Sequence, residues 1–219
     1  MKVDNEMLTL SFAGAESVDN NYSQAGQDIF VLCCLDGKRN GTFLDFGCNH
    51  PTVLNNTFLL ENKFSWKGIG VDIDKSMIDL WEGQRVSSAF RKDCRKLNFD
   101  KIIGLADTTH FDYLSLDLEP ASTTFECLDT IPFDKMEFSV ITYEHDLWRF
   151  GTHWMKESRK IIEKNGYKRI CTNIGDPCPN TKAPNPFEDW YYNPKYVSYE
   201  RIKVLESCSK DWRRVLFKG

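Results

Sequence analysis

The stretch GTFLDFGCNHP, Gly41 to Pro51, decides the fold class of this 219-residue chain. A short apolar run, TFLDF, ends in an aspartate, a glycine and an asparagine, and a proline closes the turn. The run has the length of a buried strand. Gly47 lets the chain turn tightly and brings backbone N–H groups close to a ligand. Two explanations are open: a strand that has reached the surface, or a backbone cleared so that a nucleotide can lie across it.

Outward from this stretch, short apolar runs alternate with longer helical patterns between Tyr22 and Tyr167. Apolar runs separated by helices are typical of a parallel sheet that is covered on both faces. The chain is long enough for one domain with a full core and too short for two of ordinary size. We therefore predict a single-domain, doubly wound α/β fold. The predicted strands are 42–46, 67–73, 86–90, 111–117 and 137–144, and the predicted helices are 23–35, 56–62, 75–83, 97–105, 122–129 and 152–165.

The two ends of the chain depart from this pattern. Residues 1–21 precede the first predicted helix and form an N-terminal extension, which leaves the domain at 22–219. Residues 176–194, DPCPNTKAPNPFEDWYYNP, are crowded with proline, asparagine and aromatic residues, so we expect an irregular loop there. Its four aromatic residues, from Phe187 to Tyr192, argue against disorder. A last helical pattern covers 198–212.

Composition and charge exclude several classes of function. The formal net charge is −4, and no basic face is evident that would bind nucleic acid irrespective of its sequence. No run approaches the roughly 20 apolar residues of a membrane helix, and the N-terminus lacks the pattern of a signal peptide. The eight cysteines form no C-x-x-C pair and suit a reducing compartment. We expect a cytoplasmic protein without nucleic-acid or membrane partners, and the oligomeric state stays open.

Carboxylates follow every predicted strand. In an open α/β sheet, ligands bind beyond the carboxyl ends of the strands, so these side chains should gather at one edge of the sheet. Acidic residues also favour helix starts, which would account for some of them. The strand-end groups are, in strand order, Asp45, Asp72, Asp93, Asp117 with Glu119, and Glu144 followed by His145.

The first two strand ends predict the ligand. The loop after Asp45 lacks the second and third glycines of a dinucleotide-binding turn, so it offers no pyrophosphate cradle. Asp72 ends the second strand, where an acid accepts ribose hydroxyls. An adenosine joined to a cationic amino-acid tail matches both features, and we predict S-adenosylmethionine as cofactor. Asp45 would face its amino or sulfonium end, and Asp93 its adenine amino group. The predicted cofactor-binding residues are Gln24, Asp45, Gly47, Asn49, Asn56, Thr57, Asp72, Ile73 and Asp93.

A series of motifs stands in a fixed order along the chain. They are YSQAGQDIFVL, FLDFGCNHP, NNTFLLE, WKGIGVDID, FDYLSLDLE, ITYEHD and, near the end, PFEDWYYNP. In these motifs and their order, the chain resembles the FkbM-type methyltransferases from about Tyr22 to Pro194. The resemblance implies a Rossmann-like class I methyltransferase fold and O-methylation of a hydroxyl on a sugar or a polyketide. The chain departs from the family pattern at Cys48, where alanine is common, and at Pro120 and Ser122, where D-V-E-G-A/G-E is common.

Methyl transfer to a hydroxyl requires a group that accepts the proton or stabilises the alkoxide. Residues two apart on a strand share a face, so the side chains of Asp117 and Glu119 can point into the same crevice. Glu144 and His145 stand at the neighbouring strand end. In one mechanism His145 is the general base and a carboxylate orients its ring. In the other, Asp117, Glu144 and His145 hold Mg²⁺ or Mn²⁺, which lowers the pKa of the hydroxyl. Repulsion among clustered carboxylates favours the metal. The predicted catalytic residues are Asp117, Glu119 and His145.

The segment PFEDWYYNP is the predicted acceptor platform. Aromatic faces pack on the C–H faces of sugars, and an aspartate can accept hydrogen bonds from their hydroxyls. We predict that Asp189, Trp190 and Tyr191 bind a sugar or glycan acceptor. The alternative is an aromatic segment that merely closes the core.

Three functions compete at this point. The first is an O-methyltransferase, acting on a glycan or on a small-molecule or polyketide hydroxyl. The second is a nicotinamide-dependent reductase, which the missing glycines after Gly47 disfavour. The third is a catalytically silent nucleotide-binding scaffold, in which the strand-end carboxylates would be dispensable.

Overall fold

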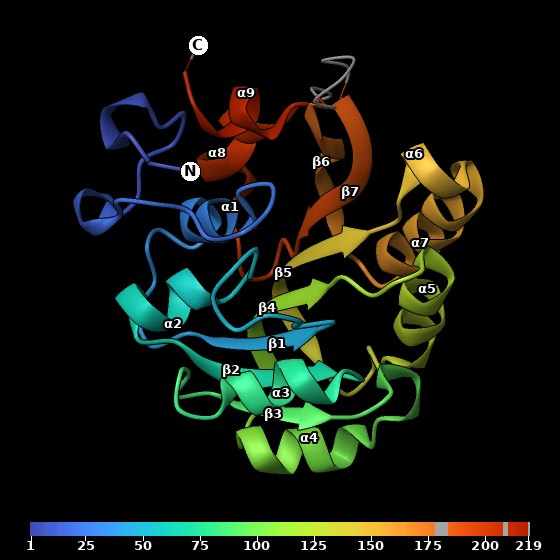
Figure 1. Cartoon of the computed structure of the whole chain (residues 1–219). Coiled ribbons are helices and arrows are strands. Elements are labelled where there is room, and N and C mark those ends of the chain that lie inside the picture. The colour runs from blue at the N-terminus through green and yellow to red at the C-terminus, as the bar shows by residue number, and fades with distance from the viewer. Residues whose placement is uncertain (178–183, 208–209, 219) are drawn as a thin grey trace.

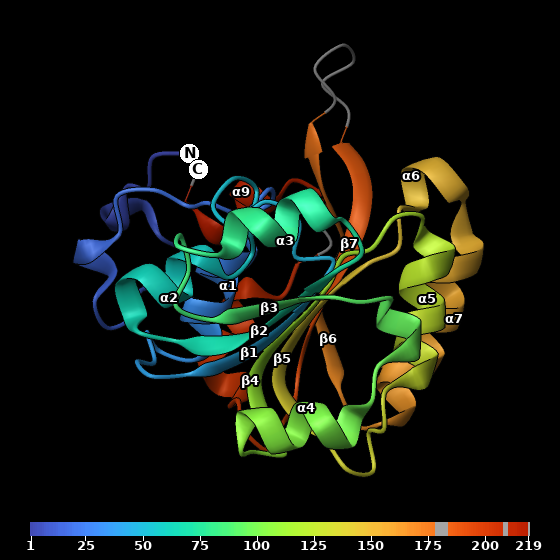
Figure 2. The same ribbon diagram turned by 60° about the horizontal axis from the view of Figure 1, so that its bottom comes forward.

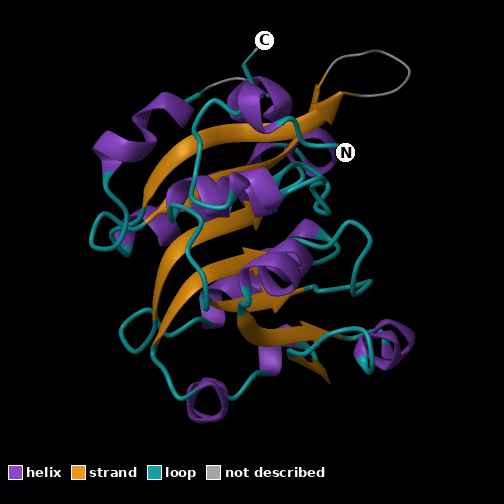
Figure 3. Ribbon diagram, turned by 90° about the vertical axis from the view of Figure 1, so that its left-hand side faces the viewer, coloured by secondary structure: helices purple, strands orange, loops and turns teal. Residues whose placement is uncertain are grey.

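The computed structural model describes residues 1–177, 184–207 and 210–218, and its centre is a seven-stranded sheet (Figure 1). The strand order is β3-β2-β1-β4-β5-β7-β6, and the sheet twists along its length (Figure 3). Strands β1 to β5 pair in parallel, whereas β7 is antiparallel to both β5 and β6. The strands are β1 (Thr42–Phe46), β2 (Lys67–Asp72), β3 (Ser88–Arg91), β4 (His110–Leu116), β5 (Glu137–Glu144), β6 (Lys168–Pro177) and β7 (Pro184–Tyr192).

Helices cover both faces of the sheet (Figure 2), as the alternating sequence pattern predicts. One face carries α1 (Gln27–Cys34), α2 (Phe58–Phe64) and α3 (Lys75–Trp81), and the other carries α4 (Phe99–Ala106), α5 (Ala121–Thr130) and α7 (Thr152–Lys164). The doubly wound α/β prediction is therefore confirmed. The short helices are α6 (Leu147–Phe150), α8 (Tyr199–Ile202) and α9 (Trp212–Leu216), with 3-10 turns at Asn5–Met7, Ala15–Ser17, Cys94–Lys96 and Lys203–Leu205.

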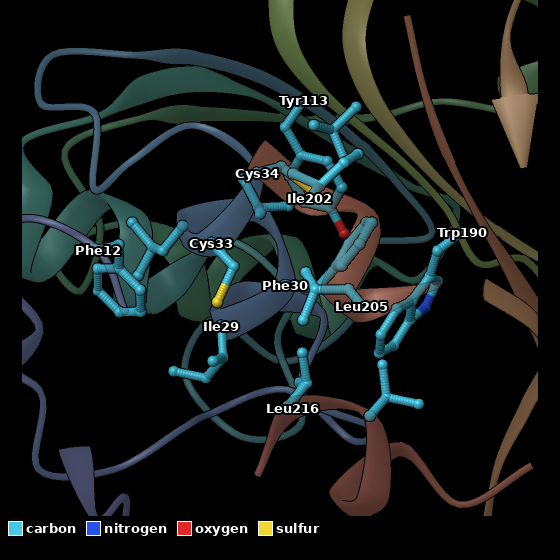
Figure 4. Close-up of a cluster of buried hydrophobic side chains, with 14 of the residues drawn as sticks. Phe12, Ile29, Phe30, Cys33, Cys34, Tyr113, Trp190, Ile202, Leu205 and Leu216 are labelled. Carbon is cyan, nitrogen blue, oxygen red and sulfur yellow. The ribbon is translucent and has the colours of Figure 1, made fainter. Parts of the chain in front are cut away.

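Alternate strand residues feed two hydrophobic clusters, one on each face. Phe43 and Tyr113 pack with α1 and α2 in the first cluster, part of which Figure 4 shows. Leu44 and Leu114, their neighbours in sequence, pack with α4, α5 and α7 in the second. Each fully buried Leu or Phe contributes about 1.5–3 kcal/mol relative to exposure. Burial on both faces explains why these strands read as continuous apolar runs.

Helix α1 begins at Gln27, four residues later than the predicted helix. Gly26 adopts the left-handed conformation (φ 74°), and a Cβ there would lie 2.7 Å from Trp212. The buried carboxylate of Asp28 accepts hydrogen bonds from the backbone N–H groups of Tyr22 (2.7 Å) and Ser23 (3.3 Å). Residues 22–26 therefore form a turn ahead of the helix rather than its first turn.

The irregular loop expected at 176–194 is wrong for the described residues. β6 extends to residue 177 and β7 starts at residue 184, whereas 178–183 lie outside the described residues. β7 lies between β5 and β6, so both of its edges are paired, and Trp190 and Tyr191 pack in the clusters on opposite faces of the sheet. Glu188, Asp189, Trp190 and Tyr191 are all buried, and their run of mixed polar and aromatic types hides the strand pattern. Pro186 lies towards the start of the strand, where a missing N–H costs little.

The chain ends lie against each other and join the core. The N–H of Thr9 donates to the carbonyl of Leu216 (2.9 Å), and Leu8 forms an isolated bridge with Phe217. Leu8 and Phe12 belong to the first hydrophobic cluster. The last helical pattern, 198–212, is broken into α8, a 3-10 turn and the start of α9, with 208–209 outside the described residues.

No helix among the described residues has the length and apolar composition needed to cross a bilayer. Two of the eight cysteines, Cys178 and Cys208, lie outside the described residues, and the other six are buried.

Candidate functional site

A cavity of about 480 Å³ opens at the carboxyl ends of β1, β2, β4 and β5. β1 and β4 are the neighbouring strands from which the sheet winds in opposite directions, and ligands of open α/β sheets bind at this point. A larger hollow of about 670 Å³ lies along the outer strand β6, away from these strand ends. The cavity is lined by Gln24, Gly47, Asn49, Leu54, Asp72, Ile73, Asp74, Lys92, Asp93, Cys94, Arg95, Asp117, Leu118, Glu119, Thr123 and Glu144.

Gly47 allows the first loop to approach β4 closely. Its φ is 83°, and a Cβ at this position would lie 1.8 Å from the carbonyl oxygen of Asp117. Only glycine satisfies both the left-handed backbone and this contact. The loop therefore lies against the end of β4, which brings Asp117 to the cavity wall.

Asp72 is held in place by backbone donors. One carboxylate oxygen accepts from the N–H of Asn49 (2.9 Å) and the other from the N–H of Asp74 (2.9 Å). A carboxylate has about four acceptor positions, so each oxygen keeps capacity for a further donor. The side chain lines the cavity next to Ile73, which is exposed. This arrangement suits an acid that receives ligand hydroxyls.

Asp93 stands at the β3 end of the cavity and is charged. It accepts from the backbone N–H (3.1 Å) and from the guanidinium (2.9 Å) of Arg95, and the hydrogen-bonded Arg95 lowers the pKa of Asp93 to about 2. Arg95 also donates to Glu126 (2.9 Å). Lys92 and Arg95 line this end of the cavity, and the sequence interpretation did not include them.

Three of the predicted cofactor residues do not line the cavity but lie in a buried network beneath it. The hydroxyl of Thr57 donates to the carboxylate of Asp45 (2.9 Å), and the amide of Asn56 donates to the hydroxyl of Ser115 (3.0 Å). Burial raises the pKa of Asp45 to about 6. The structure therefore places Asp45, Asn56 and Thr57 as supports of the loop.

The other end of the cavity is acidic. Asp117, Glu119 and Glu144 line it, and Glu119 pairs at the rim with Arg149 of α6 (3.0 Å). Burial raises the pKa of Glu144 well above its ordinary value, and the hydrogen-bonded carboxyl of Asp117 raises it further. Glu144 therefore favours its protonated form beside Asp117.

Glu188 is an acid that the sequence interpretation missed. It is buried on β7, where its backbone pairs with that of Glu144, and its carboxyl accepts from the amide of Gln27 (2.7 Å). Burial raises the pKa of Glu188 to about 8, and the nearby Asp117 contributes to this shift. The one sequence signal for Glu188 is an acidic residue inside an aromatic run, in a segment whose composition predicts a loop.

The predicted metal triad is not assembled. His145 is fully buried; its Nδ1 accepts from the N–H of Leu147 (3.2 Å), and its Nε2 lies 3.5 Å from the carboxylate of Asp189. His145 directly follows Glu144, the last residue of β5, and successive residues of an extended chain point to opposite sides. Glu144 therefore lines the cavity and His145 does not. Among residues 1–177, 184–207 and 210–218, no group of three or more His, Cys, Asp or Glu could hold a metal ion. The position of the ring also does not fit the general base expected of His145.

The predicted acceptor platform lies in the core. Asp189 accepts from the guanidinium of Arg159 (2.6 and 2.9 Å), and although burial opposes it, the contacts with His145 and Arg159 hold the pKa of Asp189 below its ordinary value. Trp190 stacks on Phe30 of α1, with 4.5 Å between ring centroids. Tyr191 is fully buried in the second cluster. The alternative interpretation, an aromatic segment that closes the core, describes these three residues.

The comparisons with known proteins address the fold. No protein-family model matches the sequence, and no curated protein matches it. A chain assigned as an rRNA methylase from Clostridium thermocellum superposes with a TM-score of 0.54 at 14% identity, over 80% of this chain and 97% of that chain. A chain assigned as an S-adenosylmethionine-dependent methyltransferase from Listeria monocytogenes gives a TM-score of 0.54 at 12% identity, over 77% and 97%.

The chain has the class I methyltransferase fold. A third solved structure, an rRNA methylase from Streptococcus thermophilus, has a TM-score of 0.50 at 11% identity, over 75% of this chain and 94% of that chain. At identities this low, the superpositions show the fold alone. The activity and the acceptor have to be argued from the site itself.

Proposed function

We propose that this class I methyltransferase domain is an S-adenosylmethionine-dependent O-methyltransferase that acts on a hydroxyl of a sugar or glycan. The main support for this proposal is the acidic cavity at the carboxyl ends of β1 and β4, with Asp72 towards one end and the Asp117–Glu144 pair at the other. Its volume, about 480 Å³, falls within the range of roughly 300–1,000 Å³ that is usual for small-molecule sites. The resemblance of the sequence motifs to those of FkbM-type methyltransferases supports the choice of a carbohydrate hydroxyl.

The lining residues fit the cofactor. Six acidic and two basic side chains line the cavity, and this excess of acids favours a ligand with sulfonium and ammonium groups. Asp72 would accept the ribose hydroxyls and Asp93 the adenine amino group. Gln24, in the turn ahead of α1, would close the site over the amino-acid end. Gly47 leaves room for the ligand to approach the loop backbone.

S-adenosylmethionine, when bound, supplies an electrophilic methyl group on a sulfonium. Transfer of this methyl group would exchange the C–S bond for a C–O bond, and the acceptor hydroxyl would have to lose its proton. Asp117 is the proposed acceptor of that proton. It lines the cavity, and its neighbour Glu144 favours its own protonated form, which leaves Asp117 as the base of the pair. Orientation of the hydroxyl in line with the C–S bond can supply on the order of 7–11 kcal/mol of barrier reduction.

An RNA acceptor, which the names of some structural neighbours raise, is less compatible with the charge of this site. Phosphate backbones are bound by lysine and arginine side chains. Here the charged side chains that line the cavity are mainly acidic, and Arg95 is already paired with Asp93 and Glu126.

Titration calorimetry with S-adenosylhomocysteine and with NADH tests the cofactor assignment. We expect binding of the first and none of the second, and the opposite result would refute the proposal. A mass-spectrometric screen for the gain of one methyl group, over glycans and small hydroxylated molecules, then identifies the acceptor. A protein that binds the cofactor but methylates no hydroxyl in the screen would fit the silent scaffold instead.

A further inference from the structure

Arg85 lies outside the cavity, yet its guanidinium is hydrogen-bonded to the cofactor loop, which we define as residues 47–57. The side chain is fully buried. One terminal nitrogen donates to the carbonyl of Pro51 (2.8 Å) and to the amide oxygen of Asn55 (3.1 Å), and the other donates to the hydroxyl of Thr57 (3.1 Å). The Nε donates to Glu61 of α2 (3.0 Å), which balances the buried charge. Three residues of the loop thus share one cation.

A second route connects Arg85 to the ligand-facing side of the loop. The guanidinium stacks over Trp81 at 4.1 Å from the ring centroid. The indole N–H of Trp81 donates to the carbonyl of Asn49 (3.0 Å), and the N–H of Asn49 donates to Asp72 (2.9 Å). Asn49 and Asp72 both line the cavity. The position of the proposed ribose acceptor therefore depends on a contact that Arg85 supports.

The loop needs such support because its backbone is unfavourable by itself. Asn49 (φ 43°) and Leu54 (φ 51°) adopt positive φ without being glycine. Conformations of this kind persist only where surrounding contacts determine them. A lysine could not replace the arginine, because an ammonium lacks the planar fork that donates to several acceptors at once and stacks on a ring.

We infer that Arg85 is a positioning residue for the cofactor, which it orders through the 47–57 loop without touching the ligand. This inference rests on the proposed function. It predicts that R85K, which keeps the charge beside Glu61, weakens S-adenosylhomocysteine binding at least tenfold. The control is R201M, because Arg201 also donates to backbone carbonyls, those of Cys33 (3.2 Å) and Ser11 (3.1 Å), at a distance from the cavity lining.

The experiment measures calorimetric affinity for S-adenosylhomocysteine, the midpoint of thermal unfolding, and amide hydrogen exchange over 48–57. R85K should lose affinity and protection in this segment, whereas R201M should lower the midpoint and keep the affinity. If R85K does not fold, R85M combined with E61Q removes the buried charges together and serves as the test. Affinity and exchange unchanged in the Arg85 variants would overturn the inference, as would an equal loss in R201M. Wild-type protein that binds no S-adenosylhomocysteine refutes the proposed function, and the exchange data then still test the loop contacts.

Discussion

At the scale of single residues, the site combines carboxyls whose environments differ sharply. Asp93 is kept ionised by Arg95, whereas burial shifts Glu144 and Glu188 towards their protonated forms. Groups with opposed environments can take different roles in one site. In this site the division is between the β3 end, which would bind the cofactor, and the β4–β5 end, which would take the proton.

Asp72→Asn should weaken S-adenosylhomocysteine binding about tenfold or more. A hydrogen bond to a charged group contributes roughly 1.5–3 kcal/mol, and the amide retains only part of it. Calorimetry measures the effect. Asp79→Asn is the control, because Asp79 is an exposed carboxylate on the following helix, where it pairs with Lys75. Equal affinity for both variants would contradict the assignment of Asp72 to the ribose.

Asp117→Asn should reduce methyl transfer to the acceptor found in the screen by roughly 10²–10⁴-fold, the usual effect of losing a general base. Affinity for S-adenosylhomocysteine should change little. Glu119→Gln should have a much smaller effect on turnover, because Glu119 is exposed at the rim and paired with Arg149. Steady-state rates near wild type for Asp117→Asn would exclude Asp117 as the proton acceptor.

Glu188→Gln should make stability less dependent on pH. The pKa of Glu188 is about 8 in the folded protein and 4.5 in the unfolded reference, so between these values only the folded state binds the proton. Raising the pH across this window therefore destabilises the wild type, by up to ~1.4 kcal/mol per pH unit. Urea unfolding from pH 4.5 to 8 should show the variant gaining stability over the wild type as pH rises. A constant difference across this range would show that Glu188 does not titrate this way.

At the scale of elements, the important feature is how loops and strand ends are brought together. The cofactor loop, residues 47–57, contacts the end of β4 because Gly47 has no side chain. The turn ahead of α1 is held by hydrogen bonds from its backbone to the carboxylate of Asp28. Local propensity predicts where most of the helices and parallel strands lie, but these close contacts between loops and strand ends depend on partners far along the sequence. This turn places Gln24 at the cavity.

Gly47→Ala should be far more destabilising than Gly83→Ala. Both glycines have positive φ, 83° and 82°, so both substitutions incur the same backbone strain. Only at Gly47 would the new Cβ overlap another backbone, that of Asp117, whereas nothing lies within 4 Å at Gly83. We expect a difference of at least ~2 kcal/mol in the free energy of unfolding, measured in urea. Similar losses at the two positions would contradict the close approach of the loop to β4.

At the scale of the whole molecule, the antiparallel pair β7–β6 completes the sheet beside β5, and side chains of β7 reach the helices on both faces of the sheet. Glu188 on one face of β7 binds α1, and Asp189 on the other binds α7. The buried ion pair of Asp189 and Arg159, with His145 beside it, therefore joins the sheet to its helical layer. His145 contributes to the fold here rather than to the cavity.

Arg159→Met should lower the free energy of unfolding by about 3–5 kcal/mol, because it leaves the buried carboxylate of Asp189 without its main partner. Lys160→Met, on the same helix, removes an exposed pair with Glu157 and should cost no more than ~1 kcal/mol. Denaturant unfolding of both variants checks the contrast. Equal and small losses would show that the Asp189 pair adds little to stability.

The sequence predicted the parallel core of the fold well, because its signals are local. Five strands and six helices could be located from periodicity and turn residues, and the acids at their ends, such as Asp72 and Asp117, do line one cavity. Around Glu188 the sequence predicts a loop and the structure has a strand, because a strand buried on both faces does not show the alternation of polar and apolar residues that marks a half-exposed strand.

The sequence by itself determined the doubly wound order of elements and the gathering of acids at the carboxyl edge, since both follow from residue types along each strand. Only the tertiary structure decided which side chains enter the cavity. Glu144 and His145 are adjacent in sequence, yet of the two it is Glu144 that lines the cavity. Asp45 and Arg85 lie outside the lining and are hydrogen-bonded to the 47–57 loop, through Thr57 and Pro51 respectively. Strand register and helix packing decide these outcomes, because they set which distant residues become neighbours.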